Sequence, residues 1–336
     1  MVSVALWRNA LTHRLGKVPV VTLMPHSRCN CRCIMCDIWK ANRGGTSLAE
    51  ETVKRLLADF KALGVQWVVL SGGEALMHPN LWALCAELKT LPVKITLLSS
   101  GLLLARHAEA IADWCDEVIV SLDGTQAIHN GIRGVTDGYQ AIVEGVAALR
   151  WAKPGFSASA RCVVQRRNFR DLRGIVSAAK SIGLDRISFL AADVSSSAFN
   201  RPEGWTQDRV EDVGLSVDES EEFANLVEEL IVKRAEDFSS GFIAENPERM
   251  RKIAAYFRAI HHASPFPEVA CNAPWVSTVV ESDGTVRPCF FHPPLGNVRD
   301  ASLPDILNSE RAVAFRRTLD MRRDPVCSRC VCTLKL

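Results

Sequence analysis

The sequence predicts an α/β fold: a partial (β/α)6 barrel of the TIM type, followed by a small C-terminal Cys-rich module with a β-hairpin. Six short apolar runs alternate with segments of helical periodicity over the first two-thirds of the 336 residues. Such alternation is typical of a parallel sheet with right-handed crossovers. No seventh or eighth unit follows, so we expect the barrel to be incomplete. A cluster of Cys residues near the C-terminus and an Asp283-Gly284 turn signal indicate the second module.

The barrel elements follow from the apolar pattern and its turn signals. The expected strands are 19–24, 66–71, 94–99, 117–122, 157–164 and 186–191. Helices are expected from a Ser47/Glu50 capping box to about 63, from Pro79 onward, and over 104–114, 138–152 and 170–182. In barrels of this type the chemistry lies at the C-terminal ends of the strands. Polar residues that follow a strand are therefore the site candidates.

The remaining chain is expected to be irregular over 192–215. A helix then spans 217–237, with a capping box from Ser216 and Glu219, and another spans 247–260. We therefore expect four parts. They are an N-terminal extension (1–17), the barrel (18–215), connecting helices (216–264) and the Cys-rich module (265–336).

Composition and charge exclude several classes of protein. The 40 Lys and Arg residues nearly balance the 38 Asp and Glu residues, which leaves a formal net charge of +2. No nucleic-acid or membrane partner is expected from this balance, and no apolar run reaches the length of a membrane span. The N-terminus does not resemble a secretory signal, so we expect a cytoplasmic location. In such a chain the 12 Cys residues indicate metal ligands better than disulfides.

Three thiols follow the first expected strand at short spacing. Cys29, Cys33 and Cys36 form a C-x3-C-x2-C pattern. Three thiolates can hold three irons of a cubane cluster and leave the fourth iron open to a small molecule. The alternative is a zinc site that Cys31 completes as the fourth ligand. In the iron–sulfur interpretation Cys31 is a bystander.

This pattern is followed by LSGGEALMHPNL (70–81) and SLDG (121–124), and together the three motifs resemble the radical S-adenosylmethionine (radical SAM) family. The resemblance implies that a [4Fe-4S] cluster on Cys29, Cys33 and Cys36 binds S-adenosylmethionine through its open iron. Reductive cleavage then yields a 5′-deoxyadenosyl radical, which abstracts hydrogen from a substrate. A flavodoxin- or ferredoxin-type protein is the expected electron donor.

The resemblance also implies contacts to the cofactor. The expected contacts are Gly72, Gly73 and Glu74 at the methionyl amine, Ser100 and Ser121 near the cofactor, Arg133 and Arg161 as carboxylate partners, and Leu190 near the adenine. The sequence departs from the family at Ala75, where Pro is frequent, and beside Cys36, where an aromatic residue is frequent. No general base is identified.

A second set of thiols lies in the C-terminal module. Cys271, Cys289, Cys327 and Cys330 can complete another cubane cluster with no open iron. A structural zinc site on the same four thiols is the alternative. The order C-x12-G-x4-C then C-x2-C resembles the twitch module, a one-cluster relative of the SPASM domain. Cys332 is then an alternative ligand or a spare thiol.

A fully ligated auxiliary [4Fe-4S] cluster is suited to electron transfer, although it could instead be structural. We therefore expect a two-electron oxidation of a small polar metabolite, such as a sugar or aminocyclitol. The alternatives are a peptide-modifying maturase, a radical decarboxylase or epimerase and, most remotely, a non-catalytic zinc-binding protein.

Several other residues have two interpretations. Asp123 either touches ribose or substrate or caps a turn, and His292 could lie near the auxiliary cluster. Asp193, Ser195, Ser196, Ser197 and Asn200 contact substrate or form a solvated loop. Cys85, Cys115 and Cys162 are expected in the core.

Overall fold

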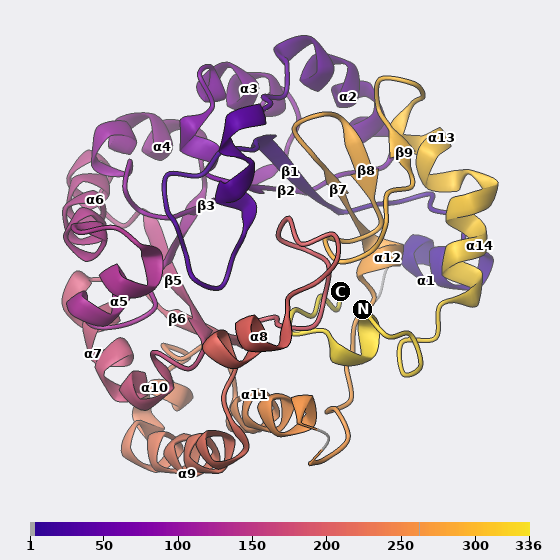
Figure 1. The fold of residues 1–336 in the computed structure, drawn as a ribbon. Coiled ribbons are helices and arrows are strands. Elements are labelled where there is room, and N and C mark those ends of the chain that lie inside the picture. The colour runs from indigo at the N-terminus through magenta and orange to yellow at the C-terminus, as the bar shows by residue number, and fades with distance from the viewer. Residues whose placement is uncertain (1–3, 262) are drawn as a thin grey trace.

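A curved sheet surrounded by helices forms the centre of the computed structural model, which describes residues 4–261 and 263–336 (Figure 1). The strand order, for the described residues, is β6-β5-β4-β3-β2-β1-β7-β8-β9. The strands are β1 (Val20–His26), β2 (Trp67–Gly72), β3 (Lys94–Ser99), β4 (Glu117–Ser121), β5 (Ser157–Val164), β6 (Ile187–Ala191), β7 (Ser277–Val280), β8 (Thr285–Arg287) and β9 (Gly296–Asn297).

The six predicted barrel strands are confirmed. Strands β1 to β6 pair in chain order, and every pair is parallel. β6 ends the sheet at one edge, so the barrel is partial, as the count of units predicts. Helices cover the outside of this arc (Figure 1).

The predicted C-terminal hairpin is also present, but it belongs to the same sheet. β7 and β8 are antiparallel and are joined through Asp283 and Gly284, where Gly284 has a φ of +86° that favours glycine. β7 also pairs in parallel with β1, with Val20 opposite Ser277 and Leu23 opposite Val280. The Cys-rich module thus continues the barrel sheet past its first strand.

The helices are as follows. They are α1 (Val4–Thr12), α2 (Glu50–Ala62), α3 (Leu81–Leu88), α4 (Ala108–Trp114), α5 (Gln126–Arg133), α6 (Gly138–Ala152), α7 (Leu172–Ile182), α8 (Gln207–Val213), α9 (Val217–Lys233), α10 (Ala235–Ser239), α11 (Pro247–Ile260), α12 (Ala273–Val276), α13 (Leu303–Asn308) and α14 (Glu310–Thr318). Short 3-10 turns occur at η1 (Ile38–Gly44), η2 (Ala75–Met77), η3 (Ala105–His107), η4 (Phe169–Asp171) and η5 (Cys327–Arg329). No described helix is long and apolar enough to cross a membrane.

The capping predictions had mixed outcomes. The Ser216/Glu219 capping box is confirmed at α9, which ends at Lys233. The Ser47/Glu50 box is wrong, because α2 begins after Ala49 and the Ser47 hydroxyl instead bonds the His26 ring at 2.8 Å. α3 begins after Asn80, so Pro79 precedes the helix.

The core positions the site at one end of the barrel. Cys85, Cys115 and Cys162 are buried among apolar side chains, which confirms the core prediction for these thiols. The loop after β1 and the segment after β6 both project over the interior of the ring (Figure 1). These two segments and the C-terminal module enclose the candidate site.

Candidate functional site

The loop that carries Cys29, Cys33 and Cys36 runs from the end of β1 to η1 and is held on both sides. The Arg32 and Ile34 amides donate to the backbone carbonyls of Arg133 (2.9 Å) and Ile132 (3.0 Å) at the end of α5. The Asn42 side chain bonds both backbone groups of Cys29, at 3.0 Å to the amide and 2.9 Å to the carbonyl. The thiols therefore lie on a preorganised loop.

The electrostatics of the loop favour the thiolate at two of the three predicted ligands, Cys29 and Cys33. The pKa of Cys33 is lowered to about 6. A hydrogen bond from Cys31 is the largest cause, and the Arg133 charge lowers the pKa as well, whereas burial raises it. Cys31 likewise lowers the pKa of Cys29, whereas burial raises the pKa of Cys36 to about 12. Thiolates are the form that binds iron. The donor set of the loop therefore fits an iron–sulfur cluster.

A buried ion pair between Arg133 and Asp123 contacts the cysteine loop. Arg133 Nη2 lies 2.5 Å from Asp123 Oδ2, and Arg133 Nη1 donates to Cys33 Sγ at 3.5 Å. Both side chains are almost fully buried, and Asp123 Oδ1 also accepts from the Val163 amide at 2.8 Å. Burial raises the pKa of Asp123, and the Arg133 charge opposes that shift. Arg133 Nε has no hydrogen-bond partner among the described residues.

The Gly-Gly-Glu motif packs directly against the cysteine loop. The Gly73 and Glu74 amides donate to the carbonyls of His26 (3.1 Å) and Arg28 (2.8 Å). A Cβ on Gly73 would lie 2.1 Å from the Arg28 carbonyl oxygen, so only glycine allows this approach. The motif thus packs against the segment that leads from β1 into the cysteine loop.

The end of β3 contacts both the Gly-Gly-Glu motif and the cysteine loop. The Glu74 carboxylate is buried and accepts hydrogen bonds from the Ser100 amide (2.7 Å) and the Ser99 hydroxyl (3.1 Å). The Ser100 hydroxyl donates to Asn30 of the cysteine loop at 3.0 Å. Ser121 ends β4, two residues before Asp123.

Arg161 and Leu190 line a cavity of about 280 Å³, together with Tyr256, Cys330 and Cys332. Arg161 is also the strand partner of Ser121 across β4 and β5, and the cofactor contacts of Arg161 and Leu190 stay predictions. Gly72 and Gly73 do not line this cavity. The structure therefore brings these two predicted cofactor residues beside the C-terminal thiols.

The segment after β6 is fixed onto the cysteine loop, which the sequence did not indicate. The Trp205 indole donates to Asp37 at 2.9 Å, and the Asp37 amide donates to the Phe199 carbonyl at 3.2 Å. α8 follows this contact. The sequence does contain a helix signal here, because Thr206 and Gly214 flank a segment with apolar residues at 210 and 213.

The polar residues of this segment divide into two groups. Asp193 forms a buried ion pair with Arg201 and accepts hydrogen bonds from the Ser195 and Ser196 amides, both at 3.2 Å. Ser197 and Asn200 line a cavity instead. Ser195, Ser197 and Asn200 are exposed, so the structure is compatible with a solvated loop, and substrate contact by this segment stays a prediction.

That cavity lies between the barrel mouth and the C-terminal module. Its volume is about 510 Å³, within the range of small-molecule sites. Its lining combines barrel residues Gly72, Gly73 and His26 with residues of the C-terminal module. The residues from that module lie in the β7–β8 turn, at the end of β8 and just after it: Glu281, Ser282, Arg287, Phe290, Phe291 and His292. A bound molecule would touch both modules.

The C-terminal thiols come from three segments. Cys271 lies just before α12, Cys289 lies just after β8, and Cys327 and Cys330 lie in η5 and directly after it. Burial raises the pKa of Cys289 to about 11, and the Cys271 and Cys332 thiols raise it further. Burial also raises the pKa of Cys330, and Cys332 again contributes. Cys332 thus lies near Cys271, Cys289 and Cys330, and its carbonyl accepts a hydrogen bond from the Cys330 thiol at 2.8 Å. A set of sulfur donors fits either a cluster or zinc.

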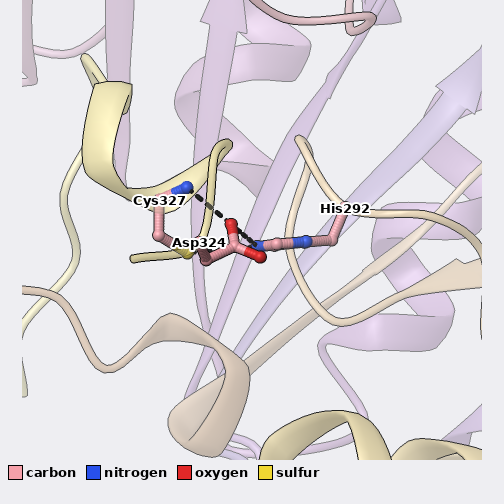
Figure 2. A group of neighbouring side chains, drawn as sticks. All are labelled: His292, Asp324 and Cys327. Atoms are coloured by element: carbon pink, nitrogen blue, oxygen red, sulfur yellow. Dashed lines mark hydrogen bonds and ion pairs between the residues drawn. The ribbon is translucent and has the colours of Figure 1, made fainter. Parts of the chain in front are cut away.

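One side chain joins this group from the cavity wall. Figure 2 shows the His292 ring directed toward Cys327, with Asp324 beside both. His292 Nε2 lies 3.1 Å from Cys327 Sγ and 3.8 Å from Asp324 Oδ1. Burial lowers the pKa of His292, and the Asp324 charge opposes that shift. His292 therefore lies beside a thiol of the second cysteine group, a position that the sequence left open.

Comparisons with known families agree with this geometry. The Radical SAM superfamily profile matches residues 23–176, and the SPASM profile, an iron–sulfur cluster-binding domain, matches residues 271–331. The division of the chain at 18–215 and 265–336 remains a prediction. None of the curated proteins compared with the chain matches it significantly.

Solved structures share the fold at low identity. SuiB from Streptococcus suis bound to precursor peptide SuiA is 14% identical and has a TM-score of 0.67, with 98% of this chain and 74% of that chain covered. SuiB bound to S-adenosylmethionine is 15% identical, with a TM-score of 0.67 over 98% and 76% of the two chains. The structure titled anSMEcpe with bound AdoMet and Cp18Cys peptide is 20% identical, with a TM-score of 0.63 over 92% and 87%.

Proposed function

We propose that this chain, which belongs to the radical SAM superfamily and carries a C-terminal iron–sulfur cluster-binding domain, oxidises a small polar metabolite by two electrons. S-adenosylmethionine and iron–sulfur clusters are its cofactors. The observation that carries the proposal is the cavity of about 510 Å³, whose lining combines residues of the Gly-Gly-Glu motif and of the C-terminal module. A substrate in this cavity would touch the Gly-Gly-Glu motif and also His292, whose Nε2 lies 3.1 Å from Cys327 Sγ.

The proposed ligands follow the geometry of each group. We assign the first cluster to Cys29, Cys33 and Cys36, and the auxiliary cluster to Cys271, Cys289, Cys327 and Cys330. The methionyl group of the cofactor would lie beside Gly72, Gly73, Glu74 and Ser100. When bound, S-adenosylmethionine would supply a 5′-deoxyadenosyl radical that takes one hydrogen atom from the substrate. The auxiliary cluster would take up one electron from the substrate radical, which would release a proton to solvent.

The residues of the chain give the cavity its selectivity. Four side chains offer hydrogen-bonding groups on its lining, which suits a hydroxylated or aminated substrate. They are Ser197, Asn200, Ser282 and Arg287. Arg287 is paired with Glu281 at 2.5 Å, so its charge is compensated before substrate binds. Cavities of this size enclose small ligands and exclude most water.

Peptide modification is the second candidate function. Phe199, Phe290 and Phe291 form a cluster with ring centroids 4.8 to 6.1 Å apart on the cavity lining. Such a surface suits an apolar side chain of a peptide. Two of the structurally similar proteins are described with bound peptides, which supports keeping this candidate.

The two candidates differ in substrate and product. Anaerobically reconstituted enzyme with a flavodoxin reductant and S-adenosylmethionine is incubated with aminocyclitols and sugars deuterated at carbon, and in parallel with synthetic peptides. We expect deuterium in 5′-deoxyadenosine and a carbonyl product that has lost two hydrogens, only with the small molecules. Deuterium transfer without a two-electron change, or turnover of peptides alone, would contradict the proposal.

A further inference from the structure

We infer that His292 donates a hydrogen bond from Nε2 to the Cys327 thiolate and thereby raises the reduction potential of the auxiliary cluster. The inference rests on the proposed function, because it treats Cys327 as a cluster ligand and the cluster as an electron acceptor. His292 is a positioning residue in this account and not a ligand.

The geometry of the contact is that of a hydrogen bond to sulfur. His292 Nε2 is 3.1 Å from Cys327 Sγ, and both side chains are buried (Figure 2). The neighbouring Asp324 Oδ1 is 3.8 Å from Nε2 and already accepts the Cys327 and Val326 amides, at 2.8 and 3.0 Å. The Cys327 sulfur is therefore the nearer acceptor for the imidazole N–H.

The ring is held in this position by its surroundings. It contacts Phe315 edge to face, with ring centroids 4.9 Å apart. The His292 carbonyl accepts a hydrogen bond from Arg287 Nη1 at 3.0 Å, which ties the segment to β8. A fixed donor keeps its hydrogen bond through a change of charge at the acceptor.

The consequence concerns the charge of the cluster. Reduction adds a negative charge, and a hydrogen bond to a ligand sulfur stabilises the more negative state. Cys271 has only weak backbone donors by comparison, from Ala273 at 3.4 Å and Leu334 at 3.5 Å. His292 also lines the cavity of about 510 Å³, so the donor lies between that cavity and Cys327.

The test is an EPR-monitored redox titration of the reconstituted holoenzyme. His292→Phe and His292→Met remove the donor, whereas His292→Gln keeps an N–H near the position of Nε2. We expect the equilibrium constant for reduction of the auxiliary cluster to fall about tenfold in the Phe and Met variants, which is about 59 mV for one electron. His292→Gln is expected to keep the wild-type potential.

The matched control is His107→Phe, on η3 beside Trp82. It should leave the potential unchanged. An unchanged potential in His292→Phe and His292→Met, or an equal drop in His292→Gln, would overturn the inference. Loss of auxiliary iron from the Phe and Met variants would also overturn it, by making His292 a ligand. The potential is measured without substrate, so a failed oxidation assay would count against the proposed function alone.

Discussion

Replacing Cys33 by alanine is expected to abolish cleavage of S-adenosylmethionine. Cys33 is the thiol that the loop most favours as a thiolate, because Cys31 and Arg133 lower its pKa to about 6. Three thiolates are needed to leave one iron open, so the loss of one removes the cofactor site. The measurement is 5′-deoxyadenosine formed per hour by reconstituted enzyme with dithionite.

Cys31→Ala is the matched control, since Cys31 lies on the same loop and is equally buried. It should retain most of the cleavage activity and the wild-type iron content, because iron binding itself deprotonates the ligating thiols even without the hydrogen bonds from Cys31. If Cys31→Ala loses as much iron as Cys33→Ala, Cys31 is a fourth ligand. The loop would then hold its metal through four thiols, as in a zinc site, and would leave no open iron for S-adenosylmethionine.

Arg133→Met is expected to destabilise the fold by about 3–5 kcal/mol, because it leaves the Asp123 carboxylate buried without a partner. Asp123 is fully buried, and its pair with Arg133 is 2.5 Å long. The measurement is urea unfolding of the reduced, cluster-free protein, followed by circular dichroism. A protein without the cluster separates this effect from metal binding.

Two further variants test the cause. Arg133→Met combined with Asp123→Asn should recover part of the lost stability, because no charge is then buried. Arg251→Met breaks an exposed pair with Glu228 and should cost at most about 1 kcal/mol. Equal losses for Arg133→Met and Arg251→Met would show that the buried pair has no structural role.

The sequence predicted the barrel well because each of its strands can be recognised from a short stretch of sequence. Each is a short apolar run bounded by turn residues, and parallel neighbours follow one another along the chain. The pairing of β7 with β1 could not be predicted in this way. Val20 and Ser277 are far apart in sequence, and nothing in either segment specifies the other as its neighbour.

The same distinction holds for the site. Cys29, Cys33, Cys36 and the Gly-Gly-Glu motif are local patterns, and the structure brings them together. The Arg133–Asp123 pair and the contact of Trp205 with Asp37 depend on how separate segments pack. The Ser47 prediction was wrong for a related reason: the side chain bonds His26 on a neighbouring strand.

The central claim is that this chain holds two [4Fe-4S] clusters, and iron per chain after anaerobic reconstitution tests it most directly. The account predicts about eight irons, falling to about four when Cys29, Cys33 and Cys36 are all replaced by alanine. About four irons in the unaltered chain, with zinc retained by the C-terminal thiols, would contradict it.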